Sequence, residues 1–476
     1  MPEAHANPAG ARSPALSLRC GRWYGDREVA LDLPAGWTVR RLDPQDAPAL
    51  DDDAIQRAFE QPIGTPRLRE LARGRRSAVL AIDDLTRPTP VHRFLPRVID
   101  ELLAGGIDAS EIRILIGTAA HRPAGAEEAA KKLGRELARR FPPLVHDFMG
   151  PEIRFVGWIR GGPVYLDRRF LAADLRICIG GAVPHDETGF GGGAKMVVPG
   201  VAGRLTIAHF HGALPPRPAG QLEAKPGQLD RRAWSEAVAR RVGVDAVVCA
   251  AVNSRAELAG LAVGDLVEAH RAAAQRAIEI GRTPVPREWA ERADVVVVNA
   301  YPLDTDPIQM GKSVRIARTF RAPCTVVVNG ASDGVFYHGM GMGSGVSSRR
   351  LLRNIPGLLG DPTSLWSWLR GMGRGIRAPE LAARLTYFSL NHLSYASFAS
   401  GEGRLGPELE AATGRGATAS PLVWSPRFPG WGFRRKYRGG RLFREWSELR
   451  DTLGARFERG EMLVLPCAPL QLPEIR

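Results

Sequence analysis

Length and composition limit what this chain can be. It has 476 residues, of which 44% are hydrophobic and 24% are charged, as is ordinary for a globular protein of two or three domains. No apolar run approaches the roughly 20 residues that span a bilayer, and the first residues contain no apolar core of signal-peptide type. The sequence therefore predicts a cytoplasmic protein without membrane contact.

The net charge of +14 would suit a nucleic-acid-binding protein if the basic residues formed one patch. They are instead spread along the chain, and no nucleic-acid-binding motif accompanies them. We expect a surface that attracts anionic substrates, and no nucleic-acid partner. The five cysteines lie far apart and form no CxxC pair, which argues against a disulfide framework and against a cysteine zinc site.

Lysine is rare in this chain, because only six of the 65 basic residues are Lys. A lysine can become a neutral nucleophile, whereas an arginine keeps its proton. Lys195 and Lys312 lie in distinctive local settings and are candidates for a function. Lys131 and Lys132 lie on what reads as a polar helix face, and we predict no role for them.

Short β-branched runs alternate with helical patterns, which is typical of an α/β fold. Most of these runs are apolar on both faces, as expected of parallel strands covered by helices. In chain order, the predicted strands are Ala78–Ile82, Ile112–Ile116, Leu175–Ile179, Ala246–Ala250, Val295–Val298 and Thr325–Val328. The predicted helices are Val91–Leu103, Glu127–Arg140, Arg231–Arg241, Leu266–Ile280 and Gln309–Thr319.

Prolines near Thr283–Glu288 predict a domain boundary. We expect an N-terminal α/β domain over residues 1–282 and a C-terminal α/β domain over residues 283–460, both with mostly parallel sheets. The C-terminal domain carries an extension rich in Gly, Arg and Trp, for which we predict no fold between about 339 and 460. Residues 461–476 read as a last strand that could return to the first domain.

Polar side chains gather where the predicted strands end. Ligands of α/β folds bind outside the carboxyl ends of the strands, so we expect these segments to form one site. Helix capping is the alternative, and it suits Asp83 and Thr89. The segments are Asp83–Pro88, Thr118–Arg122, Pro184–Glu187, and the stretch from Thr305 that includes Gln309 and Lys312.

A glycine-rich segment, GFGGGAKMVVPG, covers Gly189–Gly200 and contains Lys195. Clustered glycines before a lysine suggest backbone amides that hold a phosphate, although a flexible loop is the simpler interpretation. Met196 replaces the Ser or Thr that a Walker A loop needs for magnesium. His209 and His211 follow the segment and are two residues apart, so on a helix at most one of them would face a given site. Their spacing alone does not establish a metal site.

Together these segments resemble the nickel-dependent lactate racemase family. The resemblance rests on DDLTRPTP, GTAAHRP, the run VPHDETGFGGGAKMVVPGVAG followed by HFHG, and YPLDTDPIQMGK. It implies two α/β domains with the active site in the cleft between them. It also implies a nickel pincer nucleotide, a pyridinium-3-thioamide-5-thiocarboxylic acid mononucleotide whose sulfur and carbon atoms hold nickel.

The resemblance implies that this cofactor is attached covalently to Lys195. Asp84 and the glycines Gly191, Gly192 and Gly193 correspond to cofactor-binding positions. His211 corresponds to the nickel ligand, with His209 as the second choice. Attachment of the cofactor depends in this family on separate maturation proteins, which are the expected partners.

The resemblance also implies the chemistry, which is racemisation or epimerisation at C2 of a 2-hydroxy acid. His121 and His185 correspond to the acid/base pair. Arg87 corresponds to the group that binds the substrate carboxylate, and a planar guanidinium suits that task. Gln309 and Lys312 correspond to polar groups of the substrate pocket. Ile308 stands where we associate the family with an aromatic residue, which leaves substrate size and shape open.

Two other functions remain open from the sequence. Lys195 could form a Schiff base with a keto substrate, as in an aldolase-like enzyme. The chain could also be a non-catalytic protein that binds a nickel cofactor or nucleic acid. The paired histidines, Arg87 and Lys312 favour an enzyme, because a carrier needs no acid/base groups. The sequence predicts neither which 2-hydroxy acid is used nor the oligomeric state.

Overall fold

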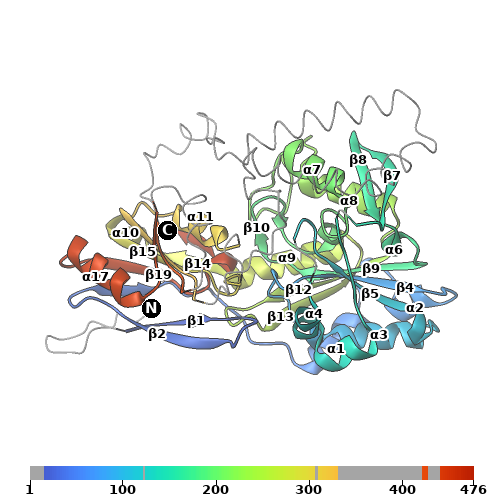
Figure 1. Ribbon diagram of the computed structural model, residues 1–476, viewed down its shortest axis with the longest axis horizontal. Helices are drawn as coiled ribbons and strands as arrows, with labels where there is room; N and C mark the ends of the chain where they lie inside the picture. Colours follow the sequence, from blue (N-terminus) through green and yellow to red (C-terminus); the bar gives the residue numbers. More distant parts are fainter. Residues whose placement is uncertain (1–14, 122–123, 149, 306–308, 331–420, 427–439) are drawn as a thin grey trace, which may run out of the picture.

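The computed structural model describes residues 15–121, 124–148, 150–305, 309–330, 421–426 and 440–476. Two six-stranded sheets lie along the long axis of the molecule, each with helices against it (Figure 1). Nearly all strand pairs within these two sheets are parallel. The predicted α/β class with mostly parallel sheets is confirmed.

The first sheet has the strand order β13-β12-β9-β4-β5-β6. Only β12 and β13 pair antiparallel. The chain runs from β4 outward to β5 and β6, and then returns to β9 on the other side of β4. The point between β4 and β9 is therefore the topological switch of this sheet. The strands are β4 (Ala78–Asp83), β5 (Ile112–Gly117), β6 (Leu144–Val145), β9 (Leu175–Gly181), β12 (Ala246–Val252) and β13 (Leu258–Gly264).

Two apolar clusters cover the two faces of the first sheet, because β4 alternates its side chains between them. Val79 and Ala81 belong to one cluster, whereas Leu80 and Ile82 belong to the other. This two-sided burial explains why β4 reads as a continuous apolar run. The helices of this half are α1 (Asp52–Glu60), α2 (Leu68–Ala72), α3 (Leu95–Ala104), α4 (Ala126–Leu133), α5 (Arg135–Arg140), α6 (Arg168–Leu171), α7 (Arg204–Gly212), α8 (Arg231–Arg241) and α9 (Glu268–Gly281).

Smaller elements project from the first sheet. β7 (Ile153–Ile159) and β8 (Gly162–Asp167) form a hairpin, as do the short strands β10 (Pro184–His185) and β11 (Gly189–Phe190). The described residues also form four 3-10 turns, of which the first three lie in this half and the fourth follows the second sheet. They are η1 (Val91–Arg93), η2 (Ala109–Glu111), η3 (Gly193–Met196) and η4 (Ala468–Leu470).

The second sheet has the order β18-β17-β16-β15-β19-β3, and all its pairs are parallel. One face packs against α17 and the hairpin of β1 and β2, and the other against α10 and α11. The bounds are β1 (Ala15–Cys20), β2 (Arg27–Asp32), β3 (Thr38–Arg41), α10 (Arg287–Arg292), β15 (Val295–Asn299), α11 (Gly311–Ala317), β16 (Cys324–Val328), β17 (Leu422–Trp424), β18 (Arg441–Phe443), α17 (Trp446–Arg456) and β19 (Glu461–Leu465).

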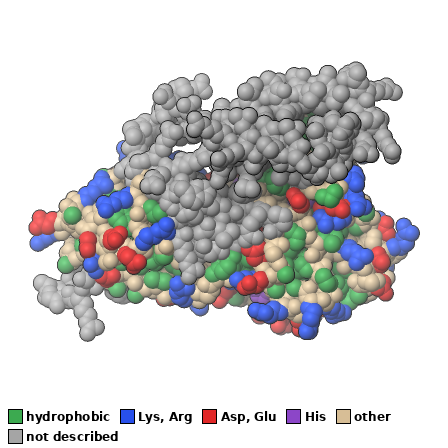
Figure 2. Space-filling view, in the orientation of Figure 1, with side chains coloured by type: hydrophobic (Ala, Val, Ile, Leu, Met, Phe, Trp, Pro, Cys, Tyr) green, Lys and Arg blue, Asp and Glu red, His purple; other side chains and the backbone are tan. Residues whose placement is uncertain are grey.

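The last residues join the second sheet to the junction between the two halves. β19 lies between β15 and β3, and the final strand β20 (Leu472–Ile475) then pairs in parallel with β14 (Arg282–Val285). Residues near the N-terminus thus share a sheet with residues near the C-terminus. On the face drawn in Figure 2, basic and acidic side chains are interspersed over the described surface.

The predicted strands all occur, and the differences concern helices. The predicted helix Glu127–Arg140 is split into α4 and α5 at Gly134, whose φ of +85° is incompatible with a continuous helix. The predicted helix Val91–Leu103 is likewise split into η1 and α3. Ile308 and most of residues 339–460 lie outside the described residues. No helix in the described part of the chain is long and apolar enough to cross a membrane.

Candidate active site

The candidate site lies at the topological switch of the first sheet, where β4 and β9 end. Asp83 is the last residue of β4 and joins the two strand ends, because its Oδ2 accepts hydrogen bonds from Gly181 N at 3.0 Å and from Thr89 Oγ1 at 2.7 Å. Asp83 and Thr89 are therefore structural, but neither caps a described helix, because they bond to each other and Asp83 bonds to the end of β9. The next residues carry the polar groups that face other loops.

Asp84 and His121 form a buried pair across the ends of β4 and β5. The distance between Asp84 Oδ2 and His121 Nδ1 is 2.6 Å, and Asp84 Oδ1 accepts from Thr86 N at 3.0 Å and from Thr86 Oγ1 at 2.5 Å. Burial raises the pKa of Asp84, but His121, Thr86 and Arg87 outweigh burial and hold that pKa well below its usual range. An ionised Asp84 accepts the Nδ1 hydrogen of His121, so Nε2 is the basic nitrogen of the ring.

Lys195, His185 and Arg87 meet beside this pair. The β10–β11 hairpin places His185 against the glycine-rich segment, and η3 carries Lys195. Lys195 Nζ lies 2.8 Å from His185 Nε2, and Arg87 Nη2 lies 3.4 Å from the same nitrogen. His185 Nδ1 accepts a hydrogen bond from Glu187 N at 3.3 Å. These contacts bring Arg87, His185 and Lys195 together, and that all four segments form one site stays a prediction.

The electrostatics of this group follow from burial among cations. Lys195 and His185 are each only 8% exposed. Burial lowers the pKa of Lys195 well below its usual range, and Arg87 and Lys312 lower it further, against the opposing effect of Glu187. Burial and Lys195 likewise lower the pKa of His185. A neutral amine next to a neutral imidazole is the favoured state, because the surrounding charges disfavour additional protons.

The glycine-rich segment is held from beneath by a buried arginine. Arg232 on α8 is 1% exposed, and its guanidinium donates to the carbonyl oxygens of Thr188, Phe190, Gly191 and Gly192. His270 Nε2 adds a contact of 2.8 Å to the carbonyl of Gly191. These five contacts, four from Arg232 and one from His270, fix the backbone of the glycine-rich segment, which would otherwise be flexible.

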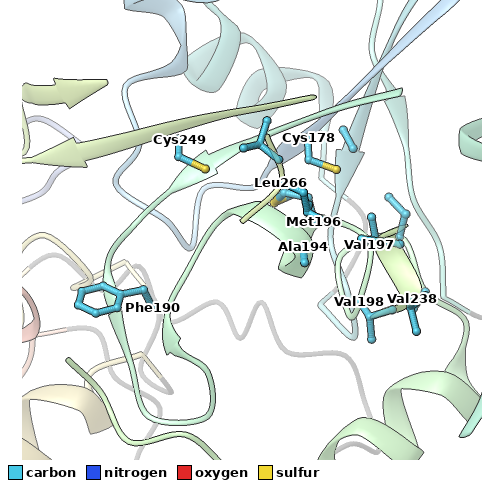
Figure 3. Packing of buried hydrophobic residues seen from close by; sticks show 14 of the residues in the cluster. Cys178, Phe190, Ala194, Met196, Val197, Val198, Val238, Cys249 and Leu266 are labelled. Atoms are coloured by element: carbon cyan, nitrogen blue, oxygen red, sulfur yellow. The ribbon is translucent and has the colours of Figure 1, made fainter. Parts of the chain in front are cut away.

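Close packing explains two of the glycines. A Cβ at Gly191 would lie 2.6 Å from the Gly181 carbonyl oxygen, and a Cβ at Gly193 would lie 2.8 Å from the His270 ring. Met196 and Ala194 lie near Cys178 of β9 (Figure 3), and Phe190 belongs to the same apolar cluster. The amide of Gly191 donates to Val183 O at 2.8 Å and is thus already used within the fold. Cofactor binding by Gly191, Gly192 and Gly193 stays a prediction.

His209 and His211, both on α7, face different surroundings. His209 is buried and packs on Trp234, with ring centroids 5.0 Å apart. His211 is partly exposed; its Nδ1 contacts Ile207 O at 2.9 Å and its Nε2 contacts Glu187 Oε2 at 3.1 Å. Glu187, which contacts His211, also influences the pKa of Lys195. His211 as the nickel ligand, with His209 as the second choice, stays a prediction.

The protein alone provides no complete metal site in the described residues, where no group of three or more His, Cys, Asp or Glu side chains is placed to hold an ion. A metal bound at His211 would take its other ligands from a non-protein group. Both ring nitrogens of His211 face oxygen atoms, since Nδ1 contacts Ile207 O and Nε2 contacts Glu187 Oε2, so Nε2 would have to leave Glu187 before it could bind a metal.

Gln309 and Lys312 come from the second half of the molecule, just before and within α11. Both are buried, and among the described residues neither Gln309 Oε1 nor Lys312 Nζ has a hydrogen-bond partner. Burial lowers the pKa of Lys312 well below its usual range, and Arg87 lowers it further, against the opposing effect of Asp186. An ion pair of 2.5 Å between Asp186 and Arg315 joins α11 to the loop after His185. An anionic ligand beside Lys312 Nζ would favour its protonated form.

Sequence reasoning missed two buried cations. We predicted a solvated Lys132, but it is 1% exposed and pairs with Asp83 Oδ1 at 2.6 Å. The prediction failed because Ala129, Lys132 and Leu133 form the buried stripe of α4 at helical spacing. Arg232 was also missed, since α8 is rich in Arg and its buried face carries arginines as well as Trp234.

Comparisons with known proteins agree with this geometry. Residues 24–220 match the model of the lactate racemase N-terminal domain. The lactate racemase of Thermoanaerobacterium thermosaccharolyticum is 29% identical over 303 residues, which cover 61% of this chain and 69% of that protein. The lactate racemase of Lactiplantibacillus plantarum is 28% identical over 307 residues, with 61% and 69% coverage.

Solved structures share the fold over nearly the whole chain. The lactate racemase apoprotein from T. thermosaccharolyticum superposes with a TM-score of 0.63 at 20% identity, covering 97% of this chain and 100% of that one. A protein from Thermotoga maritima gives a TM-score of 0.58 at 18% identity, with 90% and 100% coverage.

The fold and the sequence matches define a racemase-like enzyme with two α/β halves. Residues 24–220 are thus similar to the N-terminal domain of lactate racemases, and the chain is similar over 61% of its length to two lactate racemases at 28–29% identity.

The Asp84–His121 pair gives the first prediction. In Asp84→Asn, the two Thr86 donors require the amide oxygen, which leaves the amide nitrogen facing His121 Nδ1. His121 must then carry its hydrogen on Nε2 and loses its basic nitrogen, so kcat/KM for racemisation falls by roughly a hundredfold or more. Asp43→Asn, whose side chain is 58% exposed, serves as control. Chiral chromatography measures racemisation by both variants after cofactor loading. A kcat/KM of Asp84→Asn within twofold of wild type would contradict the role assigned to Asp84.

The anchoring of the glycine-rich segment gives the second prediction. Arg232→Met leaves several buried carbonyl oxygens without a donor, at a cost of about 1–3 kcal/mol for each group that stays dry. We expect a marked fall in the free energy of unfolding, measured by urea denaturation. Arg240→Met on the same helix, with a side chain 59% exposed, should change it by less than about 0.5 kcal/mol. Equal stabilities of the two variants would show that Arg232 does not anchor the segment.

Proposed function

We propose that this chain is a racemase or epimerase that inverts C2 of a 2-hydroxy acid, with a nickel pincer nucleotide attached to Lys195. One observation carries the proposal. The amine of Lys195 lies 2.8 Å from His185 Nε2, buried among cations at the carboxyl ends of β4 and β9. A buried neutral amine in such a place is poised for covalent attachment and has no evident structural role.

The residues present fit the cofactor. Burial among cations favours Lys195 as a neutral nucleophile, and His211, whose Nε2 would exchange its contact with Glu187 for the metal, is proposed as the single protein ligand. A single ligand suits a group that brings its own sulfur and carbon ligands to nickel. When bound, this group supplies a hydride acceptor and donor, which side chains cannot provide. Loading would depend on separate maturation proteins.

His121 and His185 are proposed as the acid/base pair, because an inverted product needs proton transfer on two sides. Asp84 fixes the Nδ1 hydrogen of His121, so its Nε2 can take the hydroxyl proton of the substrate. Glu187 N donates to His185 Nδ1, so its Nε2 is the nitrogen that exchanges a proton with the site. The two rings are thus held by separate partners and can act on different enantiomers.

Arg87 and Lys312 are proposed to bind the substrate carboxylate from the two halves of the molecule. Arg87 donates from Nη1 to Thr86 Oγ1 at 2.9 Å, and this hydrogen bond holds its guanidinium in place. Nη2 of Arg87 is directed toward His185. Lys312 Nζ and Gln309 Oε1 have no partners among the described residues. A carboxylate between Arg87 and Lys312 would relieve their mutual repulsion, and Gln309 could accept from the 2-hydroxyl group.

A Schiff-base enzyme is the second candidate, because the same depressed pKa would make Lys195 reactive toward a keto acid. It predicts borohydride trapping of a keto substrate on Lys195 and activity without nickel. It gives no role to His211, which contacts Glu187 near the site. A non-catalytic carrier leaves the Asp84–His121 pair without a purpose, so we favour the racemase.

The proposal is tested by offering the cofactor-loaded enzyme single enantiomers of 2-hydroxy acids, with lactate first. We expect each enantiomer to convert to the same equilibrium mixture, as followed by chiral chromatography, and Lys195→Arg to be inactive because a guanidinium stays charged. Lys225→Arg, a lysine outside the site, is the matched control. If a loaded enzyme interconverts no 2-hydroxy acid across small, large and polyhydroxylated examples, the racemase proposal is wrong.

A further inference from the structure

Lys132 is a buried basic residue with three oxygen partners. Its Nζ forms an ion pair of 2.6 Å with Asp83 Oδ1 and donates hydrogen bonds to the carbonyl oxygens of Asp84 and Arg87, each at 3.1 Å. An ammonium has three N–H donors, of which two make these hydrogen bonds. Burial of such a group is costly unless its charge is paired and its donors find acceptors, and three oxygen partners around one nitrogen suit lysine at this position.

Besides the Asp83 carboxylate, Lys132 contacts the backbone of residues Asp84–Arg87, here called the catalytic turn, and not the side chains of that turn. The Asp84 side chain points instead to His121, at 2.6 Å, and the Arg87 side chain points to His185, at 3.4 Å. The carboxylate of Asp83 continues the network to Gly181 at the end of β9. The Lys132 ammonium therefore fixes the backbone of two residues. One is Asp84, which orients His121, and the other is Arg87, whose guanidinium is proposed to bind substrate. Lys132 itself contacts neither histidine.

Residues that pack with the second sheet cover Lys132. The turn between β1 and β2 places the Trp23 ring 5.3 Å from Lys132 Nζ, a cation–π distance. Arg22 in the same turn donates from Nε and Nη2 to Pro88 O, at 3.4 Å each. β1 and β2 belong to the apolar cluster of the second sheet through Leu18 and Leu31. Lys132, from the first half, thus binds the catalytic turn. From the other half, Arg22 binds Pro88 O just after this turn, and Trp23 covers Lys132.

We propose that Lys132 is a positioning residue of this site, which sets the places of Asp84 and Arg87 and seals the turn against the β1–β2 hairpin. The proposal deepens the racemase function and rests on it for its kinetic consequences. Its structural consequence, the geometry of the Asp84–His121 hydrogen bond, is independent of any activity.

The test compares Lys132→Met with Lys131→Met. The two lysines are neighbours on α4, but Lys131 is partly exposed and pairs with Glu127 at 3.3 Å. Its Nζ also lies 4.2 Å from the Tyr24 ring centroid in the β1–β2 turn, so this variant controls for a cation–π contact with that turn. The first measurement uses the cofactor-free full-length chain. The Nδ1 hydrogen of His121, bonded to a buried carboxylate, gives a downfield proton resonance that is assigned by its loss in Asp84→Asn. We expect this resonance in wild type and Lys131→Met, and its loss or displacement in Lys132→Met.

The second measurement uses the cofactor-loaded enzymes, with loading confirmed by intact mass. Misplacement of Asp84 and Arg87 should lower kcat/KM by roughly tenfold to a hundredfold, with a raised KM because Arg87 binds substrate. Lys131→Met should stay within twofold of wild type. If wild type itself racemises no substrate, the proposed function fails, whereas the resonance still decides the role of Lys132.

An unchanged resonance in Lys132→Met, or a loaded Lys132→Met with wild-type kcat/KM and KM, would overturn the proposal. Equal losses in Lys131→Met would overturn it as well, since they would indicate a general effect on α4. Should Lys132→Met fail to fold, Lys132→Arg carries the test. Arginine keeps the charge but cannot direct three donors from one atom, so we expect a displaced resonance and a severalfold lower kcat/KM. Wild-type values for both in Lys132→Arg would contradict the positioning role.

Discussion

The contact between Lys195 Nζ and His185 Nε2 is the constraint on which the candidate site depends. Two basic groups 2.8 Å apart in a buried site that also holds Arg87 cannot both carry a proton without a large electrostatic cost. The amine is kept neutral by its surroundings, and the surroundings must be rigid to keep it so. Arg232 and His270 provide this rigidity through the carbonyl oxygens of the glycine-rich segment. Reactivity of the lysine and anchoring of its loop are therefore two consequences of one arrangement.

The two halves of the molecule contribute different groups to this arrangement. The first sheet supplies the lysine, both histidines and Arg87 from the ends of its strands, whereas the second sheet supplies Lys312 from α11. Contacts between the halves converge on the same loops, through Asp186 and Arg315 on one side and Arg22 and Pro88 on the other. A ligand anion held between Arg87 and Lys312 would add a further link. Substrate binding and the relative position of the halves are expected to be coupled for this reason.

Much of the fold could be predicted because β4, β9 and β15 are apolar on both faces, a pattern that parallel strands share with few other structures. The gathering of Asp84, His121, His185 and Lys195 followed from their places after strands. Lys132 and Arg232 could not be found in this way, because their importance comes from burial, and a charged residue on a polar helix looks solvated until the tertiary packing is known. The orientation of His209 toward Trp234 depends on a contact distant in sequence. The split at Gly134 requires its backbone angle, which composition does not reveal.

The central claim is that Lys195 is the attachment point of a nickel-containing cofactor. It is tested most directly by intact mass and nickel content of the chain co-expressed with the cofactor-maturation proteins, beside Lys195→Ala and a Lys225→Ala control. The account predicts a covalent mass increase and about one nickel per chain in wild type and Lys225→Ala, with the mass increase absent and nickel lost in Lys195→Ala. An unmodified wild-type mass without nickel, obtained while the same maturation proteins load a lactate racemase in parallel, would contradict it.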